Sequence, residues 1–142
     1  MLIEEQLEES VKQVFTTYAN AISTVTSWHD EEPSFPFVSI IAKSGKAEET
    51  GEHPSFTGNW TIDLEITALS HTEQQSGDEH KALFEQVRSI AFQDDILTKL
   101  QAANVGTMAV MIWTPTTFRH ESQDSAVRQS TQSVEVYLAP LS

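Results

Sequence analysis

The stretch from Trp60 to Ala68 alternates strictly between apolar and polar side chains, and it constrains the fold more than any other part of this sequence. Its apolar positions are Trp60, Ile62, Leu64, Ile66 and Ala68, and its polar positions are Thr61, Asp63, Glu65 and Thr67. Successive side chains of a strand point to opposite faces, so the pattern predicts a strand with one buried and one wet face. Such a strand is typical of an antiparallel sheet covered on one side, because strands of a doubly covered parallel sheet are apolar throughout.

An amphipathic helix is predicted near the start of the chain. Apolar residues recur at steps of three and four between Ile3 and Ile22, and glutamates dominate the first turns of the opposite face. The positive end of the helix dipole favours these glutamates. Glu8 and Lys12 have the spacing of an i,i+4 ion pair, so we expect Glu8 on the solvent side of this helix.

A second helix is predicted to begin at a capping box. Ser76 and Glu79 have the S-x-x-E spacing in which each side chain satisfies a backbone amide of the first turn. The buried stripe of this helix is predicted to be Leu83, Phe84, Val87, Ile90 and Ala91. A shorter continuation carries Ile96, Leu97 and Leu100 and is expected to end near Asn104 and Gly106.

Three further strands complete the predicted order, which is α-β-β-α-β-β in a single domain, 1–142. They are the β-favouring run 37–42, the apolar run 107–113 and the alternating run 133–138. We therefore predict an α+β fold with a mostly antiparallel sheet and two main helices on one face. The polar segments 43–59 and 114–131 are predicted to be long loops, with high mobility expected for 43–59 in the free protein.

The run from Thr107 to Trp113 is apolar at both odd and even positions, so both of its faces are expected to leave water. Two interpretations remain open. The run is either a central strand covered on both faces, or a strand with one face against another chain. Pro115 is expected to end or kink it.

Composition and charge exclude several classes of protein. The net charge is -13, with 21 acidic residues against eight scattered basic ones, so no stripe of cations is present to grip nucleic acid. The absence of cysteine excludes disulfides and thiolate chemistry. No apolar run is long enough to cross a bilayer, and the acidic N-terminal sequence MLIEEQLEES does not have the pattern of a signal peptide. We expect no membrane association and a protein that acts where it is made.

No motif indicates catalysis, a cofactor or a metal. The histidines, His29, His53, His71, His80 and His120, have no metal-ligand spacing and are interpreted as surface residues. Ser44, Gly45 and Lys46 do not complete a phosphate-binding loop, and no serine hydrolase elbow occurs. Adjacent acidic pairs such as Asp94 and Asp95 are interpreted as solvated charges. The protein is therefore not expected to be an enzyme.

The order and size of these elements resemble the tail terminator, or tail-completion, proteins of tailed bacteriophages and related neck components. The resemblance rests on the leading amphipathic helix, the strand FPFVSIIA after a proline, the strand opening on tryptophan in GNWTIDLEITALS, the helix after it and two terminal strands. It extends from about Ile3 to Leu138 and depends on spacing rather than on an invariant motif.

The resemblance implies a virion structural protein, made in the bacterial host cytoplasm, in the tail or neck of a phage. Such proteins form a ring, commonly a hexamer, that caps the tail tube and presents a surface to head-completion proteins, while DNA passes through the channel without specific binding. The partners implied are further copies of the chain, the tail tube protein and the head-completion protein. Alternatives are another neck or tail component of similar fold, or a small cytosolic ligand-binding or regulatory domain.

Ring formation needs a heterologous interface, for which the edges of the sheet are natural candidates. The residues that we expect at subunit or partner interfaces are Met108, Val110, Ile112 and Trp113 on the apolar strand, with Lys43, Lys46, Arg119 and Arg128 in the two long loops.

Overall fold

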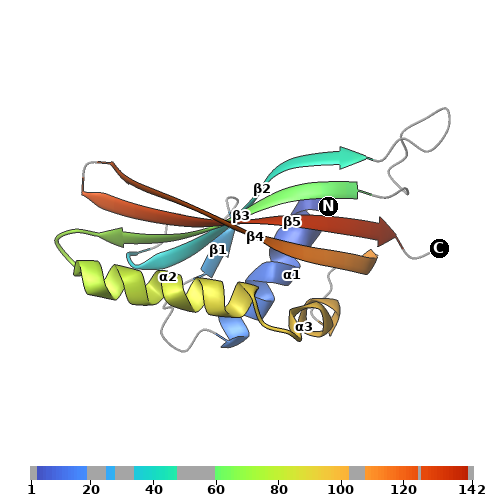
Figure 1. The fold of residues 1–142 in the computed structure, drawn as a ribbon, viewed down its shortest axis with the longest axis horizontal. Coiled ribbons are helices and arrows are strands. Elements are labelled where there is room, and N and C mark those ends of the chain that lie inside the picture. Colours follow the sequence, from blue (N-terminus) through green and yellow to red (C-terminus); the bar gives the residue numbers. More distant parts are fainter. Residues whose placement is uncertain are drawn as a thin grey trace.

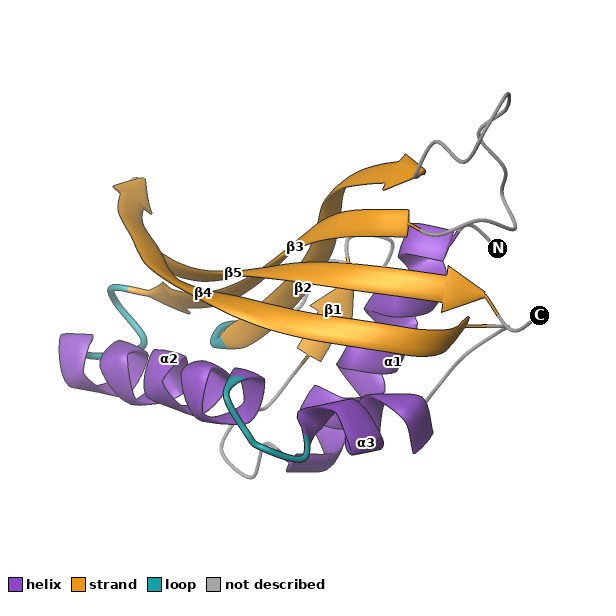
Figure 2. Ribbon diagram, turned by 45° about the vertical axis from the view of Figure 1, so that its right-hand side comes forward, coloured by secondary structure: helices purple, strands orange, loops and turns teal. Residues whose placement is uncertain are grey.

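The structure of the chain is a computed structural model that describes residues 3–18, 25–27, 34–47, 60–102, 108–124 and 126–140. Within these residues lies an α+β fold with a mixed, mostly antiparallel sheet, as the sequence predicts. The helices all lie on one side of the sheet in both ribbon views (Figures 1 and 2). The prediction of a sheet covered by helices on one face is confirmed.

The sheet has the strand order β1-β2-β3-β5-β4. Its strands are β1 Val25–Ser27, β2 Phe37–Ala47, β3 Trp60–His71, β4 Met108–Asp124 and β5 Val127–Pro140. The short strand β1, which the sequence did not reveal, pairs parallel with β2, and all other neighbours are antiparallel. Strand β3 therefore lies at the centre of the sheet, and β4 lies at one end of it.

The alternation of β3 carries over directly into burial. From Trp60 to Ala68 every second residue is buried beneath the sheet, and the intervening residues are exposed or half-buried on the other face. Fully burying an aliphatic side chain contributes roughly 1.5–3 kcal/mol, so this one strand supplies a large part of the core. The inward positions of β5 extend the same layer with Val134, Val136 and Leu138.

The first helix, α1 (Ile3–Tyr18), packs against β1, β2, α2 and α3. Leu7, Val11 and Phe15 are fully buried, as the periodicity predicts. The prediction that Glu8 lies on the solvent side was wrong, since Glu8 is only 2% exposed. A helix with neighbours on several sides buries a wider arc than its apolar stripe, and periodicity alone does not show this.

The second helix, α2 (Gly77–Ala91), confirms the predicted capping box. The Glu79 amide donates to the Ser76 hydroxyl, and the Ser76 amide donates to the Glu79 carboxylate, both at 3.1 Å. The predicted buried stripe is also confirmed, and His80 joins it. The shorter continuation is α3 (Ile96–Ala102), whose Asp95–Lys99 ion pair has a 3.2 Å separation.

The predicted loop 114–131 was wrong, because strands β4 and β5 form one long hairpin through almost all of it. Beyond a register shift between Pro115 and Arg119, the ladder continues from Arg119 opposite Gln132 to Asp124 opposite Val127. Pro115 therefore interrupts the strand without ending it. A proline is tolerated there because β4 is an edge strand, where an amide can be absent without breaking a central ladder.

The predicted loop 43–59 began too early in the chain, since β2 continues to Ala47. A register shift between Ala42 and Ser44 accommodates the extra residue as a bulge. Residues 48–59, for which we expect high mobility, lie outside the described residues.

The capping box provides a test of this architecture. Replacing Ser76 with alanine removes the acceptor of the Glu79 amide and is expected to lower the free energy of unfolding by about 1 kcal/mol. The matched control is Ser89→Ala at an exposed position of the same helix, expected to stay within about 0.5 kcal/mol of the parent. Urea unfolding measures both, and equal effects of the two substitutions would contradict the assigned cap.

Candidate assembly surface

The free side of β4 is the most distinctive surface among the described residues. No described strand lies beyond β4 in the sheet, so the interpretation of Met108–Trp113 as a central strand is excluded. Ile112 lies directly opposite Tyr137 of β5 on the face that the helices leave uncovered. Ile112 is 56% exposed and Tyr137 is 44% exposed. Directly opposed residues of antiparallel strands have Cβ atoms about 4.5–5.5 Å apart, so the two side chains form one apolar pair.

Trp113 points the other way and belongs to the core. It is 8% exposed, and its indole N–H donates to the Ala91 carbonyl oxygen at 2.9 Å. The expectation that Trp113 contacts a partner was therefore wrong, because its side chain is used to attach β4 to the end of α2. Alternation explains the result, since Ile112 and Trp113 must face opposite sides of the sheet.

A third exposed apolar residue lies at the end of α2, on the helix side of the sheet. Phe92 follows Ala91 directly and is 43% exposed, with the Arg88 guanidinium carbon 5.7 Å from its ring centroid. Ile112, Tyr137 and Phe92 are the exposed large hydrophobic residues of the described part of the chain. We call the Ile112–Tyr137 pair, which lies on the uncovered face, the edge patch.

The remaining predicted interface residues have different surroundings. Lys43 is well exposed, and its ammonium lies 3.4 Å from the Glu65 carboxylate. Arg128 is half-buried and donates to the Gln75 carbonyl oxygen at 2.9 Å, so its guanidinium binds within its own subunit. Met108, Val110, Lys46 and Arg119 lie on described strands, but their side chains lie outside what the structure describes.

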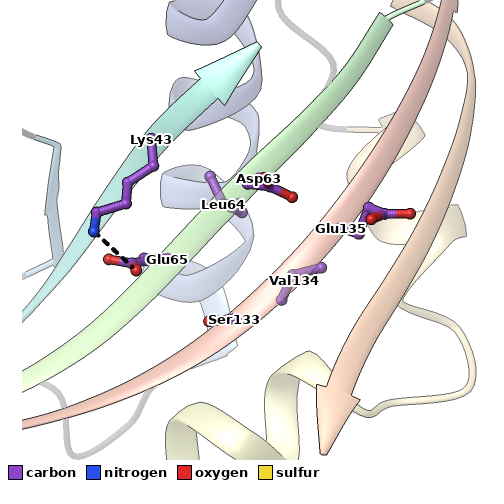
Figure 3. A pocket seen from close by; sticks show the side chains of 7 residues that line it. All are labelled: Lys43, Asp63, Leu64, Glu65, Ser133, Val134 and Glu135. Atoms are coloured by element: carbon purple, nitrogen blue, oxygen red, sulfur yellow. Dashed lines mark ion pairs between the residues drawn. The ribbon is translucent and has the colours of Figure 1, made fainter. Parts of the chain in front are cut away.

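The uncovered face of the sheet carries an acidic depression of about 420 Å³. Figure 3 shows the residues that line it, which come from β2, β3 and β5: Lys43, Asp63, Leu64, Glu65, Ser133, Val134 and Glu135. Asp63 and Glu135 are direct register partners, so two carboxylates stand opposite each other across adjacent strands. The lining therefore carries three carboxylates and one ammonium.

A buried histidine links the second helix to the sheet. His80 is 8% exposed, with Nδ1 2.7 Å from the Ser70 hydroxyl and Nε2 2.8 Å from the Ser130 hydroxyl. The interpretation of His80 as a surface residue was wrong. A serine beside a histidine can act as a nucleophile only where a substrate reaches it. Because all three residues are buried, their contact serves to hold α2 against β3 and β5.

His71 is the other histidine whose side chain the structure describes. His71 is half-buried, its Nδ1 accepts from the Glu73 amide at 3.2 Å, and its ring lies 5.6 Å from the Phe35 centroid. His29 and His53 lie outside the described residues, as does the side chain of His120. Among the described residues, no three histidine or acidic side chains are placed to hold a metal ion.

Comparison of the chain with models of known protein families and with curated proteins finds no match. The helices within the described ranges are too short or too polar to cross a membrane.

The expected interface residues did not include Tyr137 or Phe92. Tyr137 occupies a polar-side position between Glu135 and a proline-terminated strand end, and a large aromatic residue at such a position is itself a signal of an exposed contact. Phe92 comes four residues after Arg88 and seven after Glu85, so the helical period places it on the face away from the buried stripe of α2.

The linking role of His80 is testable by removing one hydroxyl. Ser130→Ala leaves Nε2 of a buried imidazole without its serine partner and is expected to cost about 1–3 kcal/mol of unfolding free energy. Ser122→Ala, at an exposed position of the same hairpin, is the matched control and is expected to be nearly neutral. Denaturant melts give both values, and a neutral Ser130→Ala variant would mean that this hydroxyl contributes nothing.

Proposed function

We propose that this chain is a virion structural subunit of the tail terminator or tail-completion class. Its copies assemble into a ring that caps the tail tube and joins it to the head-neck proteins. The observation that supports this best is the open β4 edge, with its exposed Ile112–Tyr137 pair. The architectural resemblance over Ile3 to Leu138 supplies the particular role within a phage.

An open edge strand favours assembly because its outward amides and carbonyls need partners. Natural sheets usually protect such an edge with charges or a covering element. The β4 edge instead bears the exposed Ile112, beside the exposed Tyr137 of β5. Docking another subunit there satisfies the backbone groups and removes apolar surface from water.

The net charge restricts where two copies can meet. With -13 on each chain, close approach through carboxylate-bearing surface is opposed by repulsion. The edge patch itself contains no carboxylate. Contact through it therefore brings two uncharged side chains toward the neighbour.

The uncovered acidic face suits a channel wall. Asp63, Glu65 and Glu135 would repel the phosphate backbone, so DNA would pass without adhering. The tail tube protein and the head-completion protein are then the expected partners on the two rims of the ring. Another neck component of similar fold would use the same edge and differ only in its partners.

The assembly is testable with one substitution in the edge patch. Ile112→Glu places a charge on an already exposed side chain and is expected to dissociate the assembly while shifting the melting temperature of the subunit little. Thr98→Glu, at an exposed position of α3, adds the same charge elsewhere and is expected to leave the assembly intact. Sedimentation velocity and negative-stain imaging of the parent should give a closed ring with a central channel.

A persistent monomer of the parent protein at high concentration would count against the ring and favour the alternative of a small ligand-binding or regulatory domain. For that alternative, the acidic depression would be the first surface to examine.

The terminator role itself is tested by tube growth. Adding the purified ring to polymerising tail tube protein encoded in the same genome is expected to stop elongation at the capped end, which electron microscopy measures as shorter tubes. The Ile112→Glu variant provides the control. Tubes of equal length with and without the protein would contradict a terminator role.

A further inference from the structure

The sheet has a second open edge, on the side opposite β4. Strand β1 pairs with β2 only from Val38 to Ile40, whereas β2 continues to Ala47. Among the described residues, no strand lies beside the outer edge of β2 from Ile41 to Ala47. This segment pairs with β3 on its inner side alone. Within the described residues, two strand edges therefore have no neighbouring strand, one at β4 and one at the second half of β2. We call them the open edges.

The residues of the two open edges belong to the same rows of register partners across the sheet. Following the register across the sheet, Ser44 is opposite Asp63, Asp63 is opposite Glu135, and Glu135 is opposite Thr114. A second row runs from Lys46 through Thr61 and Tyr137 to Ile112. The open part of β2 and the part of β4 that carries the edge patch therefore lie at opposite ends of the same rows of register partners.

The strand directions also match. Strands β2 and β5 run one way, and β3 and β4 run the other way, because each pair of neighbours among them is antiparallel. A copy placed beside β4 in the same orientation therefore brings its β2 antiparallel to β4. Antiparallel pairing is the more stable ladder per residue.

We propose that β4 of one subunit pairs antiparallel with the open segment of β2 of the next copy, so that the sheet continues from subunit to subunit around the ring. This inference rests on the proposed function, and it names the two surfaces that form its interface. Because the two edges share the same rows, successive copies need little translation along the strands. A head-to-tail contact without translation closes into a ring, whereas one with translation makes a filament.

The open β2 segment carries positive charge, and the face of the sheet next to β4 carries negative charge. Lys43 lies at the bulge of this segment, its side chain is 62% exposed, and its ammonium lies 3.4 Å from Glu65 of its own chain. In the continued sheet it lies near Thr114 of the neighbouring copy, one strand from that copy's exposed Glu135. The β2 segment of residues 41–47 contains two lysines and no acidic residue, which is unusual in a chain with a charge of -13. Its approach to the acidic face of a neighbour is therefore favourable.

The absence of cysteine allows a direct test with introduced thiols. Thr114→Cys and Ser44→Cys are made as separate variants, assembled together as full chains and oxidised. The expected result is a shift to twice the subunit mass in the mixture alone. The double variant Thr114→Cys/Ser44→Cys is expected to give a ladder that ends at the closed ring. Its two thiols cannot join within one chain, since three strand spacings separate them by about 14 Å.

Two controls fix the geometry. Thr114→Cys mixed with Ser89→Cys, which lies at an exposed position of α2 on the other side of the sheet, is expected to give no dimer. Each single variant alone is also expected to stay monomeric on denaturing gels. A dimer formed by Thr114→Cys alone would overturn the proposal, because it would mean a two-fold contact of β4 with itself.

Sedimentation velocity of the same samples before oxidation distinguishes a failure of the β4–β2 pairing from a failure of the proposed ring. A ring that forms no Thr114–Ser44 disulfide would overturn the pairing of β4 with β2 and leave the proposed function standing. A monomer that forms no disulfide would overturn both.

Discussion

The one-sided cover of the sheet is the constraint on which the rest of this structure depends. Because α1, α2 and α3 all pack against the same face (Figure 1), the inward positions of β3 and β5 form a single core layer, and the other face keeps exposed residues such as Asp63 and Glu135. The same arrangement sets which residues can serve function. Ile112 and Tyr137 are exposed because they are register partners on the uncovered face, and Trp113, the next residue of β4, is buried because it faces the helices.

The uncovered face of the sheet carries two kinds of surface. Its centre has the carboxylates of Asp63 and Glu135 on neighbouring strands, and its end has the exposed Ile112–Tyr137 pair beside the edge of β4. In the proposed ring, the apolar edge meets a neighbour while the acidic centre remains exposed to solvent.

Local pattern was enough to predict the parts of the fold where side-chain chemistry and geometry agree. The alternation that begins at Trp60 and the capping box at Ser76 each depend on neighbours in sequence, and both are confirmed. The hairpin through 114–131 was not predicted because its polar residues bury little apolar surface. Backbone pairing stabilises it, and backbone pairing leaves no apolar period in the sequence. Burial of Glu8 depends on the strands and helices that surround α1, which no local window contains.

The central claim is that the outer edge of β4 is paired in the assembled protein, and amide hydrogen exchange measures this most directly. Alternate amides of an edge strand point away from its neighbour and exchange quickly unless another chain accepts their hydrogen bonds. The account predicts that the outward amides between Met111 and Thr114 become protected as concentration rises and the ring forms. Rapid exchange of these amides in fully assembled protein would contradict it.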